Sequence, residues 1–73
     1  MSNNLIQALI LKYKGEVLVA KANIKTFIDN PNGVADHPDQ AATLDGLVKQ
    51  LSDAEEQLNT LLTLQDDKEF IVE

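Results

Sequence analysis

Apolar residues recur along the first part of the chain at alternating intervals of four and three positions. Between residues 6 and 27 this spacing runs without a break through Ile6, Ile10, Tyr13, Val17, Ala20, Ile24 and Phe27. Such spacing places side chains on one face of a helix, and its regular alternation is typical of helices that pack side by side. The pattern predicts a helix over residues 4–28 with one buried stripe.

The second half of the chain carries a stripe of the same kind. Its members are Leu44, Leu47, Leu51, Ala54, Leu58 and Leu61. This stripe predicts a second helix over residues 38–66. We expect Pro38 at the first helical position, where a missing N–H costs no hydrogen bond. Asp39 then lies in the first turn, where a negative charge complements the helix dipole.

Residues 29–37 form a predicted loop between the two helices. Pro31 disfavours the helical conformation at Asn30, and Gly33 accepts a positive φ, so this segment carries a strong turn signal. Two helices of about 25 residues would each be about 38 Å long. Equal lengths and a short loop predict an all-α fold, an antiparallel two-helix hairpin in a single domain over residues 1–73, with a C-terminal tail over residues 67–73.

The predicted first helix is apolar on more than one side. Away from its stripe lie Leu5, Leu11, Leu18, Val19 and Ala22, and beside the two stripes lie Leu9, Val48, Leu62 and Leu64. A helix that is apolar over so wide an arc is buried on more than one side. We therefore expect a homo-oligomeric helical bundle, most simply a four-helix bundle of two hairpins, with higher cyclic states left open. The tail segment Phe70-Ile71-Val72 is also expected to dock on a surface.

The charge is divided unevenly between the two halves. Residues 1–28 carry four lysines and one glutamate, a net charge of +3, whereas residues 29–73 carry eleven acids and two lysines, a net charge of −9. The whole chain has a formal charge of −6 and no arginine. This division favours attraction between the antiparallel helices, and the alternative is that each half addresses a different partner.

The composition excludes several classes of protein. The absence of cysteine excludes disulfides, thiolate catalysis and cysteine-based zinc sites. No apolar run is longer than the four residues at positions 17–20, which is far too short to span a membrane. The first residues carry no basic segment of the kind that begins a signal peptide. We expect a cytoplasmic protein with no membrane partner.

No motif in the sequence predicts catalysis. The one histidine, His37, lies in the predicted loop, and no serine or threonine stands at a hydrolase-like spacing from it. Asp36, His37 and Asp39 would need a further ligand to hold a metal ion, so a solvated acidic loop is the favoured interpretation. We expect a protein that is not an enzyme, with no catalytic residue, no metal and no cofactor.

Three lysines share one edge of the predicted first helix. Lys14, Lys21 and Lys25 follow one another at spacings of seven and four. A basic edge suits phosphate groups, but the net charge of −6 argues against long nucleic acid as a partner. A small anion needs only a few local lysines. The alternative is that these lysines pair with acids of the second helix.

The loop and its flanks carry a resemblance to a known group of proteins. The pattern N-P-x-G-x-x-(D/E)-H-P-D matches residues 30–39, and its flanks match Ala20-Lys21-Ala22-Asn23-Ile24 and Ala54-Glu55-Glu56. The chain thereby resembles short uncharacterised helical-hairpin proteins of tailed bacteriophages over most of residues 5–62. The resemblance implies a phage accessory protein that acts in the bacterial host cytoplasm. In size, helicity and expected oligomerisation the chain is also similar to phage anti-defence proteins that sequester nucleotide-derived immune signals.

These expectations lead to one hypothesis for the function and two alternatives. The leading hypothesis is a homo-oligomer, a dimer or higher, that captures a small anionic nucleotide-type ligand in a pocket of the oligomer. Its ligand-binding residues would be Asn30, Asn32, His37, Lys21, Lys25 and Tyr13, with Phe27 as an alternative apolar wall. The first alternative is an acidic protein that inhibits a host protein or mimics DNA. The second is a small structural or assembly adaptor.

Overall fold

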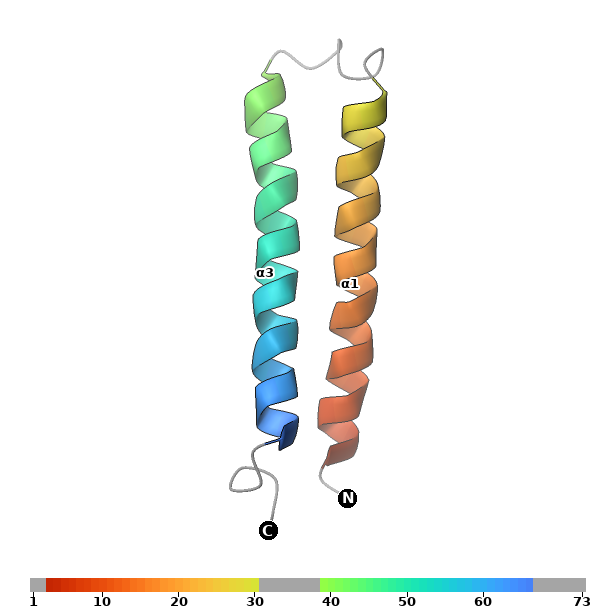
Figure 1. The fold of residues 1–73 in the computed structure, drawn as a ribbon, viewed down its shortest axis with the longest axis vertical. Helices are drawn as coiled ribbons and strands as arrows, with labels where there is room; N and C mark the ends of the chain where they lie inside the picture. Colours follow the sequence, from red (N-terminus) through yellow and green to blue (C-terminus); the bar gives the residue numbers. More distant parts are fainter. Residues whose placement is uncertain (1–2, 31–38, 67–73) are drawn as a thin grey trace.

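Two long helices lie side by side and run in opposite directions (Figure 1). The computed structural model describes residues 3–30 and 39–66. Helix α1 spans Asn3–Asp29 and helix α3 spans Gln40–Asp66, each with 27 residues. The residues described contain no strand, which confirms the all-α hairpin. Assembly of hairpins into a bundle stays a prediction.

Helix α3 begins later than the sequence suggested. The N–H of Ala42 donates a hydrogen bond of 2.9 Å to Oδ1 of Asp39, and the N–H of Thr43 donates one of 3.2 Å to the carbonyl of Asp39. These two bonds make Asp39 the N-cap, because its carboxylate satisfies a backbone donor of the first turn. Asp39 therefore precedes the first helical residue of α3 and caps it, whereas the sequence had placed it inside the first turn. Pro38 itself lies outside the residues described.

The predicted stripe of α1, here called the inner stripe, faces α3. All seven of its members are buried or half-buried, and every other residue of α1 from Asn4 onward is exposed. Ile10 and Ala20 are the most enclosed, with 4% and 3% of their surface exposed. The spacing of apolar residues alone therefore located the whole contact face of this helix.

The stripe of α3 is confirmed in the same way, and it extends further than expected. Its six predicted members are buried or half-buried, with Ala54 and Leu61 the most enclosed. Leu64, which was expected beside the stripe, is half-buried as well. It follows Leu61 by three positions, so it continues the stripe by one more step of the helical repeat.

The contact between the helices is confined to one face of each and gives the molecule a thin core. Only four apolar side chains in the described part are buried. The radius of gyration is 16.5 Å, compared with about 11 Å for a compact domain of this length. The chain exposes 5507 Å², about 1,000 Å² more than a compact monomer of 8.0 kDa would. A single hairpin thus leaves surface that a compact fold would cover.

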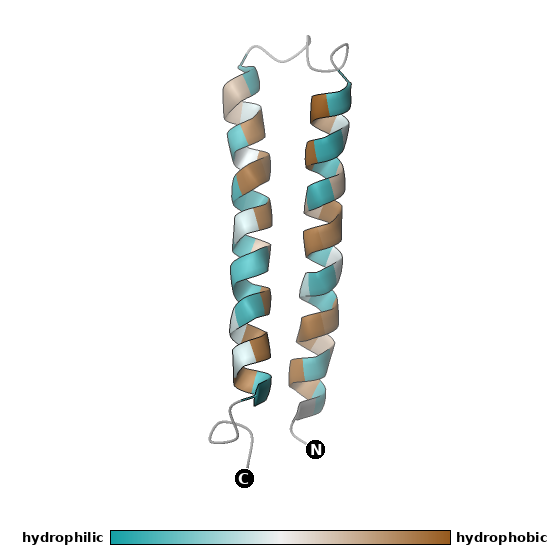
Figure 2. Cartoon of the chain, in the orientation of Figure 1, coloured by the Kyte–Doolittle hydropathy of each residue, from teal (hydrophilic) through white to brown (hydrophobic). Residues whose placement is uncertain are grey.

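Much of the surface left uncovered is apolar and belongs to α1. Leu11 and Leu18 each have 68% of their surface exposed, and Leu5 has 77%. In Figure 2 the hydrophobic colour of α3 lies mainly on the side toward α1, whereas in the middle of α1 it continues across the helix. Neither described helix is long and apolar enough to cross a membrane.

Candidate functional site

A second apolar stripe runs along α1 on the side away from α3. Its members, here called the outer stripe, are spaced by three and four positions and are all exposed: Ala8, Leu11, Gly15, Leu18 and Ala22. At 100° per residue this stripe lies about 150° around the helix from the inner stripe. Leu5 and Val19, also exposed, lie beside it. Helix α1 therefore has two opposite apolar faces, and α3 covers one of them.

The glycine at the centre of the outer stripe is not required by packing within the hairpin. A Cβ built on Gly15 would meet no atom within 4 Å. Glycine inside a helix costs about 1 kcal/mol relative to alanine. The same holds for Gly46 of α3. Gly15 leaves open space at the centre of the outer stripe, and a partner could occupy that space.

The outer stripe ends at an ion pair near the C-terminus of α1. Continuing the spacing beyond Ala22 leads to Lys25 and Asp29, whose Nζ and Oδ2 atoms are 2.6 Å apart. The pairing of Lys25 with Asp29 of its own helix shows that the sequence-based alternative, a pairing with acids of the second helix, is wrong for this lysine. Lys12–Glu16 and Lys49–Asp53 are likewise pairs within one helix, at 4.0 and 3.0 Å.

Two of the predicted ligand-binding lysines lie together. Lys21 and Lys25 line one groove along the edge of the hairpin, whose other walls are Ile24, Ile28, Asp29 and Leu51. The groove combines an apolar floor with two cationic side chains. Lys25 is partly neutralised by Asp29, so Lys21 is the stronger candidate for an anion contact.

Tyr13 does not join this groove. It lines a different one, together with Leu9, Glu56, Gln57, Thr60 and Leu61. Helical spacing puts Leu9 and Lys21 on opposite sides of the inner stripe, and residues 13 and 21 are about 12 Å apart along the axis. The Lys12 ammonium also lies 5.0 Å from the centre of the Tyr13 ring. A site that joins Tyr13 to the lysine groove is therefore not formed within one hairpin.

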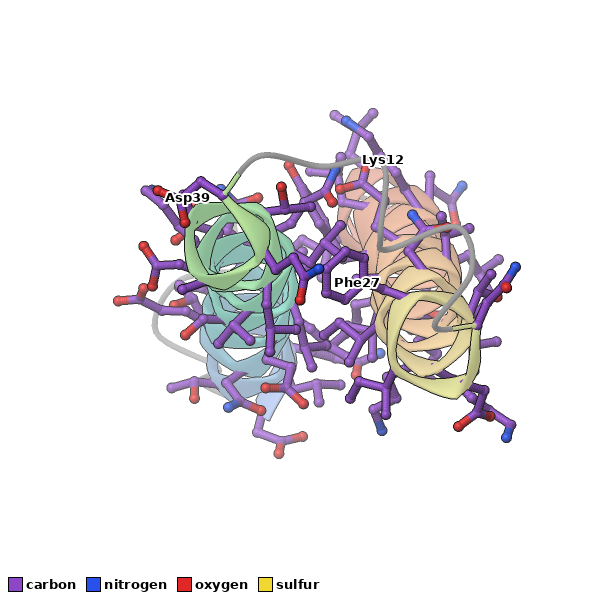
Figure 3. All side chains as sticks on the ribbon, turned by 90° about the horizontal axis from the view of Figure 1, so that it is seen from above. Lys12, Phe27 and Asp39 are labelled. Carbon is purple, nitrogen blue, oxygen red and sulfur yellow. The ribbon has the colours of Figure 1, made fainter. Side chains whose placement is uncertain are left out.

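The remaining candidate residues lie at or beyond the end of α1. Phe27 belongs to the inner stripe, and its ring points between the two helices (Figure 3). Asn30 follows α1 directly and is exposed. Asn32 and His37 lie outside the residues described, as do Asp36 and the segment Phe70-Ile71-Val72. Within residues 3–30 and 39–66 no group of three or more potential metal ligands gathers.

The outer side of α3 is acidic and polar. Its exposed carboxylates are Asp45, Asp53, Glu55, Glu56 and Asp66. Figure 3 shows carboxylate oxygens around the side of α3 that points away from α1, beginning with the labelled Asp39. This side of the molecule is unlike the outer side of α1, where the middle of the helix carries the outer stripe. The two helices thus offer two chemically distinct surfaces.

Comparison of the chain with protein-family models, with curated proteins and with solved structures gives no match. The resemblance to phage helical-hairpin proteins therefore stays a prediction, and the function has to be argued from the surfaces of the hairpin.

Proposed function

We propose that this protein is a non-enzymatic binding module that works by self-association of its helical hairpin. The observation that supports it most strongly is the outer stripe of α1, an exposed apolar face with the spacing of a helix-packing seam. An exposed apolar patch that is contiguous and rimmed by charge is typical of an interaction site. The excess of about 1,000 Å² in exposed surface exceeds the roughly 800 Å² that one partner contributes to a standard interface.

The proposal is tested by measuring the mass of the protein in solution. We expect sedimentation and native mass spectrometry at micromolar concentration to show an oligomer. Replacing two exposed leucines, Leu11→Gln with Leu18→Gln, should return the protein to a monomer, because both side chains lie away from α3. Val48→Gln is the matched control, since Val48 is an exposed apolar residue on the other helix. A wild-type protein that is only monomeric at micromolar concentration would refute self-association.

A second candidate function is the capture of a small anionic ligand of nucleotide type. It is favoured by the groove that places Lys21 and Lys25 beside the apolar residues Ile24 and Ile28. Lysines supply charge for phosphate, and an apolar floor suits the face of a base. Combined with the resemblance to phage proteins, this groove supports a role in which the protein sequesters an immune signal in the host cytoplasm.

Calorimetry against a panel of cyclic nucleotides and ADP-ribose derivatives tests this second candidate. We expect Lys21→Gln to weaken binding at least tenfold. Lys49→Gln, which removes a lysine of α3 outside the groove, serves as the control. No heat from any member of the panel, with wild-type protein of confirmed helicity, would exclude this candidate and leave self-association untouched.

A further inference from the structure

The outer stripe alternates small and large residues in a way that fits a copy of itself. Ala8, Gly15 and Ala22 recur every seven positions, and Leu11 and Leu18 fall between them. Each leucine is thus flanked along the stripe by residues with little or no side chain. A partner helix that fills these gaps has to bring large groups to the level of the small residues.

We infer that α1 packs against α1 of a second copy in the antiparallel direction, with each leucine seated on a glycine or alanine. This inference rests on the proposed self-association and specifies its surface and register. In this register Leu18 meets the partner's Gly15, and Leu11 meets the partner's Ala22. The same contacts repeat about the twofold axis, which passes close to Glu16 and Val17. Four layers result, and every one of them joins a large residue to a small one.

A parallel arrangement would lose this fit. Equal residues would then lie at the same level, so Gly15 would face the partner's Gly15 and Leu18 would face the partner's Leu18. Small residues opposite each other leave voids, and large ones opposite each other hold the helices apart. The helix dipoles also favour the antiparallel direction, because opposite ends come together.

A second copy is the occupant that the observations favour over an unrelated helix. The stripe spans residues 8–22, about 21 Å of helix, and its size pattern is complementary to its own reverse when the two copies are offset by one step, which leaves Ala8 level with the partner's Lys25. It ends at the Lys25–Asp29 ion pair, so the contact is bounded by charge. Because the outer stripe is opposite the inner one, the dimer is a row of four helices with the two α1 helices in the middle. The closed four-helix bundle expected from the sequence would need adjacent apolar faces instead.

The register has an electrostatic consequence. Lys14 and Lys21 lie along the same edge of the outer stripe. Antiparallel packing places Lys14 within about 3 Å, measured along the axis, of the level of the partner's Lys21. The repulsion between them is screened by salt. The dimer should therefore tighten as sodium chloride is raised, and Lys14→Glu should tighten it about tenfold at low salt, since it replaces two repulsions by attractions.

Single cysteines test the register, because the chain contains none of its own. Under mild oxidation Leu18→Cys should form a disulfide-linked dimer, since residue 18 lies near the twofold axis. Ala8→Cys should not, since the two copies of residue 8 would be about 25 Å apart along the axis. A parallel dimer would cross-link at both positions. Both variants are run beside sedimentation of the reduced protein, which reports whether each still associates.

The outcomes separate this inference from the proposed function. Cross-linking at residue 18 alone, together with a tighter dimer for Lys14→Glu and an unchanged one for the control Lys49→Glu, supports the antiparallel register. Cross-linking at both positions overturns it. Cross-linking at neither position in a protein that still sediments as a dimer also overturns it, while self-association stands. A reduced wild-type protein that is monomeric overturns both.

Discussion

At the scale of single residues, Asp39 determines where α3 begins. Its carboxylate accepts the Ala42 N–H, and its carbonyl accepts both the N–H and the hydroxyl of Thr43. Sequence reasoning found the right neighbourhood from His37-Pro38-Asp39 but placed the start two residues early. Proline is common at the first helical position and aspartate at the N-cap, so both indicate a helix start. The exact first residue depends on whether the aspartate side chain bonds to the backbone, and residue spacing does not show this.

The first prediction concerns this cap. Asp39→Ala should lower the free energy of unfolding by about 1 kcal/mol, because one backbone donor of the first turn loses its partner. Asp39→Asn should retain most of the stability, since asparagine caps equally well. Urea unfolding followed by circular dichroism at one fixed protein concentration measures both. Asp45→Ala, an exposed acid within α3, is the control, and an equal loss for Asp45→Ala and Asp39→Ala would contradict the capping role.

The second prediction compares the two helical glycines. Neither Gly15 nor Gly46 has an atom within 4 Å of a built Cβ, so glutamine at either position should raise the helicity of the isolated hairpin, by up to about 1 kcal/mol in stability. In the dimer they differ, because Gly15→Gln fills the space that the partner's Leu18 would occupy. Gly15→Gln should therefore weaken association at least tenfold by sedimentation, and Gly46→Gln should not. Equal association of the two variants would count against the outer stripe.

At the scale of the helices, α1 shows which features the spacing of apolar residues can predict. The inner stripe was predicted in full, because a buried helix face appears in the sequence as apolar residues spaced by three and four. This spacing can be recognised without any knowledge of the neighbouring helix. The sequence also placed Leu11 and Leu18 away from this stripe and Leu9 beside it. The exposures confirm this placement, since Leu11 and Leu18 are 68% exposed and Leu9 is 41% exposed.

The candidate ligand site stays a prediction, because it was expected in a pocket of an oligomer. Within one hairpin, Tyr13 and Lys21 lie in different grooves on the two edges of the inner stripe. The groove that a side chain of α1 lines depends on how α3 packs against α1. The order of residues along α1 alone does not give this packing. Asn32 and His37 lie outside the residues described, so their part in a site stays a prediction.

The third prediction separates the two faces of α1 with neighbouring residues. Ile10→Ala removes a side chain that is 4% exposed, so it should lower the free energy of unfolding by about 2–5 kcal/mol. This loss should be present at every protein concentration. Leu11→Ala should destabilise the protein only at concentrations where the dimer forms, because Leu11 is free of α3. Urea titrations at low and high protein concentration test this, and a concentration-independent loss for Leu11→Ala would place that residue in the hairpin core.

At the scale of the whole molecule, the main feature is that the hairpin exposes more surface than a compact monomer of the same mass would. The radius of gyration is 16.5 Å, and four apolar side chains are buried among residues 4–30 and 39–66, so the hairpin has a small core for its length. Small chains without disulfides or metals usually gain stability through oligomerisation. Length and composition therefore predict a partner, and the exposed residues of α1 indicate the face on which we propose that it packs.

The fourth prediction follows from mass action. If only folded chains dimerise, association stabilises the folded state, and it does so more strongly as the protein concentration rises. The stabilisation is about 2.7 kcal/mol when the concentration of free partner is a hundred times Kd. The Tm should therefore rise with protein concentration in melts followed by circular dichroism. The double variant Leu11→Gln with Leu18→Gln is the comparison and should melt at one temperature throughout. A wild-type Tm that does not depend on concentration would contradict a stabilising dimer.

The acidic outer side of α3 has a consequence for how large an assembly grows. In a row with the two α1 helices at the centre, both outer flanks are α3 faces that carry Asp45, Asp66 and the Lys49–Asp53 ion pair, a net negative charge. Two such flanks repel each other, and they offer no apolar seam for a third hairpin. An apolar face that recurred on both sides of the hairpin would propagate into fibres. In the proposed dimer, the charge on α3 would therefore limit the assembly to two hairpins.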